Sequence, residues 1–523
     1  MGLNQKKNQS ENYVSDSDSL LSVNPFSNKE YQIPSVLDDR KNIDKFINNN
    51  EGKKVIVVQG LGYVGAAMAV VCANAIKEDY AVIGVDLANK QSFWKIRSIN
   101  EGIFPFIADD PKIEDYFQSS RDRGNFYATF DEYAYSTADV VIVDINLDVQ
   151  IDFLKDTFFK KRRKKEISSY HIDMTGFKSA IQSIGKNCRE NALVLIESTV
   201  PPGTTEQIVL PILKDSLEKR GLNSSHIKLG HSSERVMPGP DYIDSIQNFY
   251  RVYSGIDEIS ADHTENFLRT IISTEDYPLT RLSSTNSTEI SKVLENSYRA
   301  MNIAFISEWS RFAEESGVNL FEIIDAIKMR PTHSNMMYPG IGVGGYCLTK
   351  DPLLAGWSRN NIYGSDEKLS QSEISVDINN QMPQDAFNFL KSKYQDEVLG
   401  KNILLLGVSY RGDVSDTRSS PVESFYHNCI DANCEVSLHD PYVNFWEEIK
   451  RHVPKHLGEV LRPGFDVVAI TSGHSVYKTR KFIDHLMIVR PKIIYDSIGI
   501  LAAEDIFRLQ RVSKVCVIGR GDI

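Results

Sequence analysis

A single cysteine lies inside a glycine-rich run in the stretch YPGIGVGGYCLTKDP, residues 338–352. Glycines at this density rarely build a core, and they let a backbone come close to another group. Here they would bring Cys347 with them, and the pair Lys350 and Asp351 follows directly. In a reducing compartment a free thiol can act as a nucleophile or a reagent. The stretch therefore predicts a loop that presents Cys347 to something it binds.

Two further stretches carry residues that could assist a reaction. In STEISKVLENSYRAMN, Lys292 and Asn296 are four residues apart, so they share one face of a helix and could hold and polarise a hydroxyl oxygen. On a surface helix the same pair would have no function. In HSSERVMPG, residues 231–239, Glu234 stands next to Arg235. That pair is either a surface ion pair or a carboxylate that activates water.

A dinucleotide site is predicted by Gly60-Leu61-Gly62-Tyr63-Val64-Gly65, which follows a strand directly and opens a helix. The first glycine makes the turn, the second lets the backbone approach a pyrophosphate, and the third lets helix pack on strand. Asp86 ends the next strand at about the expected twenty-residue distance, where a carboxylate binds a ribose 2′-hydroxyl and repels a 2′-phosphate. These features favour NAD over NADP.

A second ligand signal is ESTVPPGTT, residues 197–205, which leaves a strand with polar side chains and turns on Pro-Pro-Gly. Open α/β sheets bind ligands at the carboxyl ends of their strands. Thr199 is therefore expected to face the nicotinamide and the substrate, although a simple turn would read the same way.

The elements that must position these residues are an α/β series, a helical middle and a second α/β series. Short apolar strands alternate with helices from residue 53, long helices occupy 286–330, and a new series begins at KNILLLGVSY, residues 401–410. This order predicts an α/β protein with two Rossmann-like, doubly wound parallel sheets joined by a central long-helix region. The expected parts are a flexible extension (1–50), an NAD-binding domain (51–260), a central helical and dimerisation region with the cysteine loop (261–385) and a nucleotide-sugar-binding domain (386–523).

Composition excludes several classes of protein. The chain has 523 residues, of which 41% are hydrophobic and 25% charged, as is ordinary for a soluble globular protein. No apolar run approaches the ~20 residues that cross a bilayer, the N-terminus lacks the apolar core of a signal peptide, and no Cys/His cluster has zinc spacing. We therefore expect a cytoplasmic protein with no metal site and no membrane partner. A net charge of −11 argues against nucleic-acid binding, and the basic run at 160–165 is expected to be a solvated loop.

The motifs and their order resemble the UDP-glucose/GDP-mannose dehydrogenase family, the nucleotide-sugar 6-dehydrogenases, over about residues 53–510. The stretches that carry the resemblance are GLGYVG, INEGIFPF, ESTVPPGTT, SSERVMPG, KVLENSYRAMNIAF, GVGGYCLTKDP and SYRGDVSDTRSSP. Each motif alone is moderately specific, whereas seven in the family's order are a strong signal.

The resemblance implies oxidation of the C6 alcohol of a sugar nucleotide to a carboxylate with two NAD. Cys347 would attack the intermediate aldehyde to give a thiohemiacetal, and a second oxidation would give a thioester that water hydrolyses. By motif match, Lys292 stabilises the developing oxyanion, Asn296 and Asp351 position the water or base, and Thr199 and Glu234 assist with water.

The resemblance also implies residues that bind the substrate. They are Glu234, Arg235, Lys292, Tyr338, Gly344, Lys350, Arg418 and Arg330. Arg418 lies in the DTRSSP loop of the domain that binds the nucleotide in the family. Arg330 stands near the position of an arginine that the family takes from a neighbouring subunit, although the spacing differs.

Two stretches depart from the family pattern. Where the family has a Val-Pro-Thr-Pro type of turn, this chain has VDINLDVQID, residues 143–152, so the loop on the nicotinamide side is expected to be rebuilt. Near residue 496 the family's arginine is absent and Ser497 stands in YDSIGIL. One nucleotide or sugar contact is therefore expected to be lost or replaced.

The sequence favours an NAD-dependent 6-dehydrogenase that supplies a UDP-uronic acid for polysaccharide synthesis. GGYCLTKDP is similar to enzymes acting on UDP-glucose, and SSERVMPG to those acting on UDP-N-acetylhexosamines. The alternatives are a two-electron β-hydroxyacid-type dehydrogenase, which would not need Cys347, and a non-catalytic nucleotide-binding protein, which would not retain Lys292 and Asn296. The resemblance further implies a homodimer or larger homo-oligomer joined through the central helices.

Overall fold

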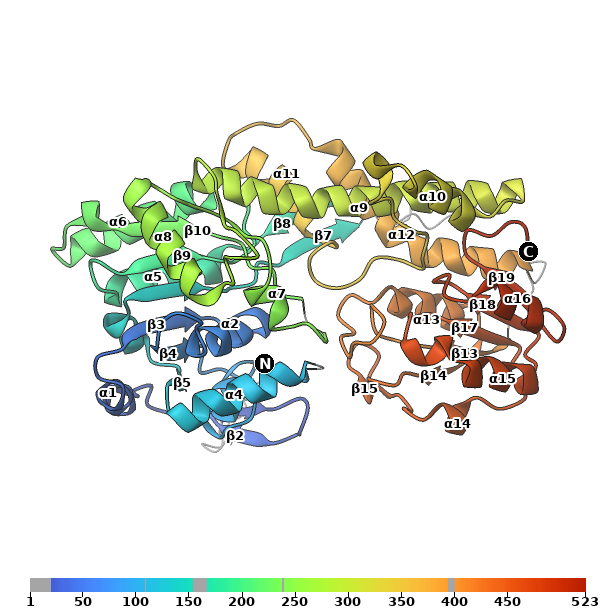
Figure 1. The fold of residues 1–523 in the computed structure, drawn as a ribbon, viewed down its shortest axis with the longest axis horizontal. Coiled ribbons are helices and arrows are strands. Elements are labelled where there is room, and N and C mark those ends of the chain that lie inside the picture. Colours follow the sequence, from blue (N-terminus) through green and yellow to red (C-terminus); the bar gives the residue numbers. More distant parts are fainter. Residues whose placement is uncertain (1–19, 109, 154–166, 238, 394–399) are drawn as a thin grey trace, which may run out of the picture.

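The computed structural model describes residues 20–108, 110–153, 167–237, 239–393 and 400–523. They form two α/β domains, and the long helix α9 (Thr285–Ser316) runs from one to the other, as Figure 1 shows along the top of the molecule. The predicted fold of two Rossmann-like domains joined by long helices is confirmed.

The first domain is built on an eight-stranded sheet in the order β12-β11-β10-β9-β6-β3-β4-β5. Neighbouring strands are parallel except for β10 and β11. The strands are β3 (Lys54–Gln59), β4 (Tyr80–Val85), β5 (Phe126–Thr129), β6 (Val140–Val143), β9 (Leu193–Ile196), β10 (Lys228–His231), β11 (Val252–Gly255) and β12 (Thr280–Arg281). The chain runs outward from β3 to β5 and returns to β6 on the other side of β3. The carboxyl ends of β3 and β6 therefore flank the point where such sheets bind ligands.

Helices cover both faces of this sheet. One face packs against α2 (Tyr63–Ala73), α3 (Phe93–Asn100), α4 (Pro111–Arg123), α7 (Asp244–Gln247) and α8 (Glu258–Ile271). The other packs against α5 (Thr175–Asn187) and α6 (Leu210–Lys219). Burial on both faces explains why the strands read as continuous apolar runs rather than as alternating ones.

The second domain has a five-stranded parallel sheet in the order β14-β13-β17-β18-β19. Its strands are β13 (Asn402–Leu406), β14 (Glu435–His439), β17 (Val467–Ile470), β18 (Ile493–Asp496) and β19 (Lys514–Val517), and the two-stranded β15 (Phe445–Trp446) and β16 (Arg451–His452) lie outside it. Its helices are α13 (Pro421–Asp431), α14 (Leu457–Val460), α15 (Arg480–Val489) and α16 (Ala503–Leu509). The chain changes direction between β13 and β17, which gives this sheet a ligand-binding edge of its own.

The central region consists of α9 with α10 (Leu320–Lys328), α11 (Asp351–Asn361) and α12 (Ser370–Lys393). The N-cap of α9 is Ser284, whose side chain accepts a hydrogen bond from Ser287 N. Its C-cap is Gly317, which has a left-handed backbone with a φ of 72°. Both α11 and α12 pack along α9. Since α11 begins at Asp351, this packing brings the cysteine loop to the helix that carries Lys292 and Asn296.

The expectation of a flexible extension over residues 1–50 is wrong from residue 20 onward. β1 (Leu21–Val23) pairs with β2 (Glu30–Gln32), and α1 (Arg40–Asn49) buries Ile43 and Phe46 against the first domain. Tyr31 is buried on the other face of the sheet. Composition averaged over a polar stretch hides such isolated anchors, which are enough to hold the segment. Residues 1–19 lie outside the described residues.

The first domain also extends past the expected boundary at residue 260. Phe267, Leu268 and Ile271 of α8 belong to its core, and β12 adds a strand to its sheet. At the other end of the central region, α12 continues beyond 385 to Lys393. Long helices therefore cross the boundaries that a change of pattern suggested.

The rebuilt segment 143–152 leads into a hairpin of β7 (Val149–Phe153) and β8 (Ile167–Ile172). This hairpin leaves the first domain and reaches α12, where Tyr170 donates a hydrogen bond to Glu373 at 2.9 Å and Ile167 N donates to Asp377 at 2.8 Å. The basic run at 160–165, expected to be a solvated loop, lies outside the described residues.

Candidate active site

The loop between β3 and α2 has the geometry of a dinucleotide cradle. Gly60 has a φ of +95°, and a Cβ placed on Gly65 would lie 1.8 Å from Gly60 O, so only glycine fits at position 65. A Cβ on Gly62 would meet nothing within 4 Å, so its lack of a side chain leaves open space at the amino end of α2. Val64 follows in the first turn of α2. The residues present fit a pyrophosphate held at a helix N-terminus.

Asp86 lies next to this loop and is held in place by two neighbours. Its Oδ2 accepts a hydrogen bond from Leu61 N at 3.1 Å and lies 2.6 Å from Lys95 Nζ of α3. Both side chains of this ion pair are nearly buried. The carboxylate is therefore placed as the sequence predicted, but Lys95 compensates its charge, which sequence spacing did not indicate.

One face of α9 carries the polar centre of the site. Asn296 Nδ2 donates to Asp351 Oδ2 at 2.8 Å, and Lys350 Nζ donates to Asp351 Oδ1 at 2.9 Å. One turn earlier, Lys292 Nζ donates to Glu234 O at 3.1 Å and lies 3.6 Å from Glu234 Oε1. All five side chains are buried. Three segments that are distant in the sequence thus meet, as the motifs predicted.

Cys347 is the exposed one among the six cysteines, all of which lie within the described residues. Its carbonyl oxygen accepts hydrogen bonds from Lys350 N and Asp351 N, which fixes it at the start of α11. Desolvation raises the pKa of its thiol to about 11, with Asp351 and Glu234 raising it further and Lys292 and Lys350 opposing them. The thiol therefore has carboxylates and ammonium groups within electrostatic reach and is protonated at neutral pH.

Thr199 follows β9 and is half-buried at the carboxyl edge of the first sheet. A residue that sequence reasoning missed ties this turn to α9. Glu289 accepts hydrogen bonds from Gly203 N at 2.6 Å and from Thr205 N at 2.8 Å, and burial raises its pKa to about 7. It stands three residues before Lys292, so helical spacing could have indicated it.

The loop of residues 407–418 follows β13 and also contributes residues that the motifs did not single out. Gly344 and Gly345 of the cysteine loop pack against Tyr410, because a Cβ on either glycine would lie within 3.0 Å of that side chain. Gly345 N donates to Arg418 O at 3.1 Å. An aromatic residue four positions after the end of β13 was the available signal for Tyr410.

Arg418 of the second domain contacts the dinucleotide loop of the first domain. Its guanidinium stands 4.2 Å from the centre of the Tyr63 ring, in the dinucleotide loop, and pairs with Asp416 at 2.6 Å. Tyr63 in turn stacks on Phe106, with the centres of the two rings 4.1 Å apart. The second domain therefore reaches the cofactor loop of the first through this arginine.

Three other predicted substrate residues lie against protein groups or face the solvent. Arg235 pairs with Glu295 of α9, Tyr338 donates to Asp325 and stacks on Phe321, and Arg330 is exposed after α10. Ser497 is buried, and its hydroxyl donates to Ile470 O at 2.8 Å. Since that hydroxyl is used within the sheet, Ser497 does not replace the family's arginine.

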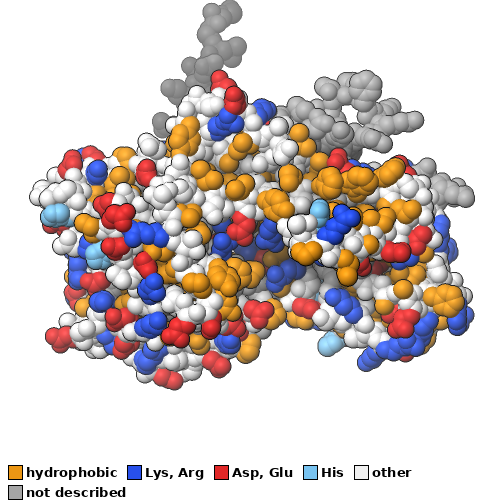
Figure 2. Space-filling view, turned by 45° about the horizontal axis from the view of Figure 1, so that its top comes forward, with side chains coloured by type: hydrophobic (Ala, Val, Ile, Leu, Met, Phe, Trp, Pro, Cys, Tyr) orange, Lys and Arg blue, Asp and Glu red, His pale blue; other side chains and the backbone are white. Residues whose placement is uncertain are grey.

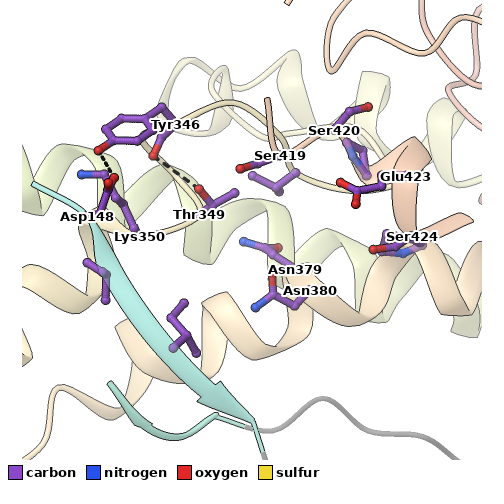
Figure 3. A pocket seen from close by; sticks show the side chains of 15 residues that line it. Asp148, Tyr346, Thr349, Lys350, Asn379, Asn380, Ser419, Ser420, Glu423 and Ser424 are labelled. Carbon is purple, nitrogen blue, oxygen red and sulfur yellow. Dashed lines mark hydrogen bonds between the residues drawn. The ribbon is translucent and has the colours of Figure 1, made fainter. Parts of the chain in front are cut away.

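A cavity of about 380 Å³ lies behind the cysteine loop. Figure 3 shows Asp148 and Tyr346 at one side of it and Glu423 and Ser424 at the other; the Tyr346 hydroxyl donates to Asp148. The lining residues are Asp148, Val149, Ile151, Val343, Tyr346, Thr349, Lys350, Asn379, Asn380, Pro383, Ser419, Ser420, Pro421, Glu423 and Ser424. Strand β7, which continues the segment 143–152, therefore forms one wall of the space beside the cysteine loop.

The rebuilt segment also places an acid beneath the dinucleotide loop. Within the described residues, neither carboxylate oxygen of Asp144 has a hydrogen-bond partner, and burial together with Glu197 raises the pKa of Asp144 well above its usual range. Glu197 is itself buried and pairs with Arg251 at 2.7 Å. The surroundings of Asp144 therefore disfavour its charged form, beside a buried ion pair.

A hollow lies between the two domains in the space-filling view (Figure 2). Figure 2 shows basic and acidic side chains gathered there. Within the described part of the chain, no helix is long and apolar enough to cross a membrane.

Comparison with protein families gives three consecutive matches. They are the NAD binding domain (residues 54–271), the central domain (286–380) and the UDP binding domain (404–503) of the UDP-glucose/GDP-mannose dehydrogenase family. The matched regions follow the two sheets and the helical middle of the structure in order.

Individual relatives match over almost their full length. The chain is 30% identical to the UDP-N-acetyl-D-mannosamine dehydrogenase of Methanocaldococcus jannaschii, over 88% of this chain and 95% of that protein. A solved UDP-D-ManNAc dehydrogenase from Pyrococcus horikoshii superposes with a TM-score of 0.72 and 28% identity, covering 90% of this chain and all of the other. The solved structure of an NDP-N-acetyl-D-galactosaminuronic acid dehydrogenase from Methanosarcina mazei superposes with a TM-score of 0.71 and 26% identity. The match covers 92% of this chain and 98% of that one.

Proposed function

The chain belongs to the UDP-glucose/GDP-mannose dehydrogenase family and is an NAD-dependent UDP-sugar dehydrogenase, and from this premise we propose that its substrate is a UDP-N-acetylhexosamine. The three relatives described above act on UDP-N-acetylmannosamine or carry N-acetylgalactosaminuronic acid in their names. The motif SSERVMPG supports the same choice, and UDP-glucose is the alternative that GGYCLTKDP favours.

The carrying observation is the hydrogen-bonded group around Asp351. Asn296 and Lys350 each donate to one of its oxygens, so the carboxylate is held rigidly and has lone pairs left for a water molecule or a substrate hydroxyl. Cys347 precedes this group on the same loop. We assign Asp351 and Asn296 to positioning the base or water that takes the proton from the C6 hydroxyl.

Lys292 is proposed to stabilise the oxyanion. Its ammonium group donates to one backbone carbonyl, so donors remain for a developing alkoxide. Glu234 and Thr199 are proposed to hold the water that hydrolyses the thioester. A donor that is already held in position stabilises a developing negative charge at little reorganisation cost.

NAD, when bound, accepts the two electrons of each oxidation step. Gly60, Gly62, Gly65 and Asp86 are proposed to hold it, with Tyr63 and Arg418 covering the same loop. Cys347 would retain the sugar as a thiohemiacetal between the two oxidations, so that the aldehyde does not escape, and as a thioester after the second oxidation until water hydrolyses it.

The stoichiometry of the reaction tests this function. A panel of UDP-glucose, UDP-N-acetylglucosamine, UDP-N-acetylmannosamine and UDP-N-acetylgalactosamine is assayed for NADH formation, and products are weighed by mass spectrometry. We expect one N-acetylhexosamine substrate to give two NADH and a uronic acid with no free aldehyde. Preference for UDP-glucose would overturn the choice of sugar, and one NADH per substrate would overturn the covalent four-electron route.

A homodimer joined along α9 is proposed as the working form. Six large hydrophobic side chains are exposed on α9 at helical spacing: Ile290, Leu294, Tyr298, Phe305, Trp309 and Phe312. Trp309 contacts Phe305 and Phe312 with ring centres 6.0 and 5.9 Å apart. An exposed apolar stripe of this length is typical of an interface, and a two-fold dimer would cover it with a second copy of itself.

A cytoplasmic location is supported by the thiol chemistry. The mechanism needs Cys347 reduced, and its exposure would make it vulnerable in an oxidising compartment.

A further inference from the structure

The loop of residues 407–418 touches three separate parts of the active site. Tyr410 packs against Gly344 and Gly345 of the cysteine loop. Arg411 Nη2 lies 2.7 Å from where a Cβ on Gly239 would be, in the segment that carries Glu234. Arg418 lies over Tyr63 of the dinucleotide loop. The position of this one loop therefore sets the fit between the two domains.

A buried histidine on the neighbouring strand connection holds this loop. His474 follows β17 and is fully buried. Asp413 N donates to its Nδ1 at 2.9 Å, so Nδ1 is the unprotonated nitrogen. Nε2 then carries the proton and donates to Asp440 Oδ2 at 3.0 Å. The imidazole is thus a neutral bridge between the loop and the end of β14.

Asp440 fastens the other end of the loop. Its Oδ2 also accepts hydrogen bonds from Val408 N at 2.8 Å and Ser409 N at 3.2 Å. The carboxylate is fully buried, and the hydrogen bonds from His474 and the backbone hold its pKa below the usual range in spite of burial. Asp440 therefore hydrogen-bonds the loop at residues 408–409, and His474 hydrogen-bonds it at residue 413.

The backbone between these two anchor points is tightly constrained. Asp413 has a φ of +56°, and a Cβ on Gly412 would lie 2.4 Å from Gly473 O. A left-handed residue next to a glycine in close contact does not keep its conformation by itself. Without His474, Asp413 N would lose a buried acceptor, and the turn that aims Tyr410 and Arg411 would lose its support.

We propose that His474 is a positioning residue for catalysis: through Asp440 and Asp413 it fixes the loop of residues 407–418 against the cysteine loop, without contacting the substrate itself. The inference rests on the proposed function only where turnover is measured. Its first readout is the reactivity of Cys347 in the protein without ligand, which is independent of the sugar that the enzyme accepts.

The experiment compares three variants with a matched control. His474→Ala removes the hydrogen bonds to Asp413 N and Asp440 and the contact of Nε2 with Ser409 Oγ at 3.2 Å. His474→Asn offers an amide oxygen where Nδ1 accepts from Asp413 N, and His474→Gln offers an amide donor where Nε2 reaches Asp440. The control is His439→Ala. The imidazole of His439 is equally buried in the same domain but bonds to Tyr477 at 2.7 Å and to Lys455 O at 3.1 Å; only its backbone carbonyl, which the substitution keeps, accepts from Gly407 N of the loop.

For each protein we measure the thermal midpoint, the iodoacetamide alkylation rate of Cys347 and KM and kcat with the accepted UDP-sugar. We expect both alanine variants to unfold at lower temperature. Only His474→Ala should change the alkylation rate, by about threefold or more, and raise KM for the UDP-sugar about tenfold, because only there does Tyr410 leave the cysteine loop. His474→Asn or His474→Gln should restore part of both losses.

Two results would overturn the proposal. One is an alkylation rate within twofold of wild type in a folded His474→Ala protein or, where that variant does not fold, no change at all in alkylation rate and KM in both His474→Asn and His474→Gln. The other is an equal change in His439→Ala, which would show that destabilising the domain is sufficient. If no UDP-N-acetylhexosamine is turned over, the alkylation comparison still decides the role of His474, and the proposed substrate alone is wrong.

Discussion

Cys347 differs from the other cysteines in its surroundings, and its role can be separated from theirs by substitution. Cys347→Ser keeps size and polarity but offers a nucleophile with a far higher pKa. We expect the variant to bind NAD and substrate yet lose more than nine-tenths of its turnover. Cys72 is fully buried in α2, so Cys72→Ser should lower stability more than rate. The measurements are kcat and thermal melts; a Cys347→Ser enzyme that keeps more than about a tenth of wild-type kcat would contradict covalent catalysis.

The raised pKa of the Cys347 thiol predicts a pH dependence. With a pKa of about 11, the reactive thiolate is the minor form at neutral pH, and its fraction grows about tenfold for each unit of pH up to that value. We expect iodoacetamide to alkylate the free enzyme faster as pH rises from 7 to 10, without a plateau in that range. Alkylation is followed by mass spectrometry with Cys347→Ser as the blank. A plateau near pH 8 would show that the thiol has an ordinary pKa.

Asp86 and Lys95 together should set the choice of cofactor. A like-charge contact costs about 4 kcal/mol at an effective dielectric constant near 20, and solvent reduces this discrimination to about ten- to a hundredfold in favour of NAD. Asp86→Asn removes the repulsion and leaves Lys95 to pair with a 2′-phosphate, so the preference for NAD should fall at least tenfold. Lys95→Met should widen it. The preference of each variant is measured as the ratio of kcat/KM with NAD to kcat/KM with NADP. If this ratio rose in both variants, or fell in both, the account would be contradicted.

At the scale of elements, the loop between β3 and α2 contains one glycine that is required for packing, Gly65, and one that faces open space, Gly62. Gly65→Ala should destabilise the first domain by roughly 1–3 kcal/mol, because the new Cβ would lie 1.8 Å from a backbone oxygen. Gly62→Ala meets no protein atom, so it should melt like wild type but bind NAD more weakly, since its backbone approaches the pyrophosphate. Thermal unfolding with and without NAD separates the two effects. If the two variants without NAD unfolded at the same temperature, the close packing at Gly65 would not contribute to the stability of the domain.

At the scale of the whole molecule, the stripe on α9 predicts the oligomeric state. Trp309→Glu places a charge among Phe305 and Phe312 and should convert a dimer to monomers, because a buried unpaired charge is costly at an interface. Light scattering after size-exclusion chromatography measures the mass. The control is Ile488→Glu, an exposed apolar residue on α15 far from the stripe in the sequence. A monomeric wild-type protein, or a dimer that survives Trp309→Glu, would contradict an α9 interface.

The sequence by itself determined the two parallel sheets, the dinucleotide loop and the shared face of Lys292 and Asn296. All of these follow from local rules: strand and helix periods, the turn that glycines permit, and the distance from one strand to the next. Only the tertiary structure decided which segments meet. That Arg418 covers Tyr63, that Lys95 neutralises Asp86 and that His474 holds the loop beside Tyr410 depend on contacts between distant segments. Such contacts form within each domain and between the domains only once the elements have packed together, and no local pattern encodes them.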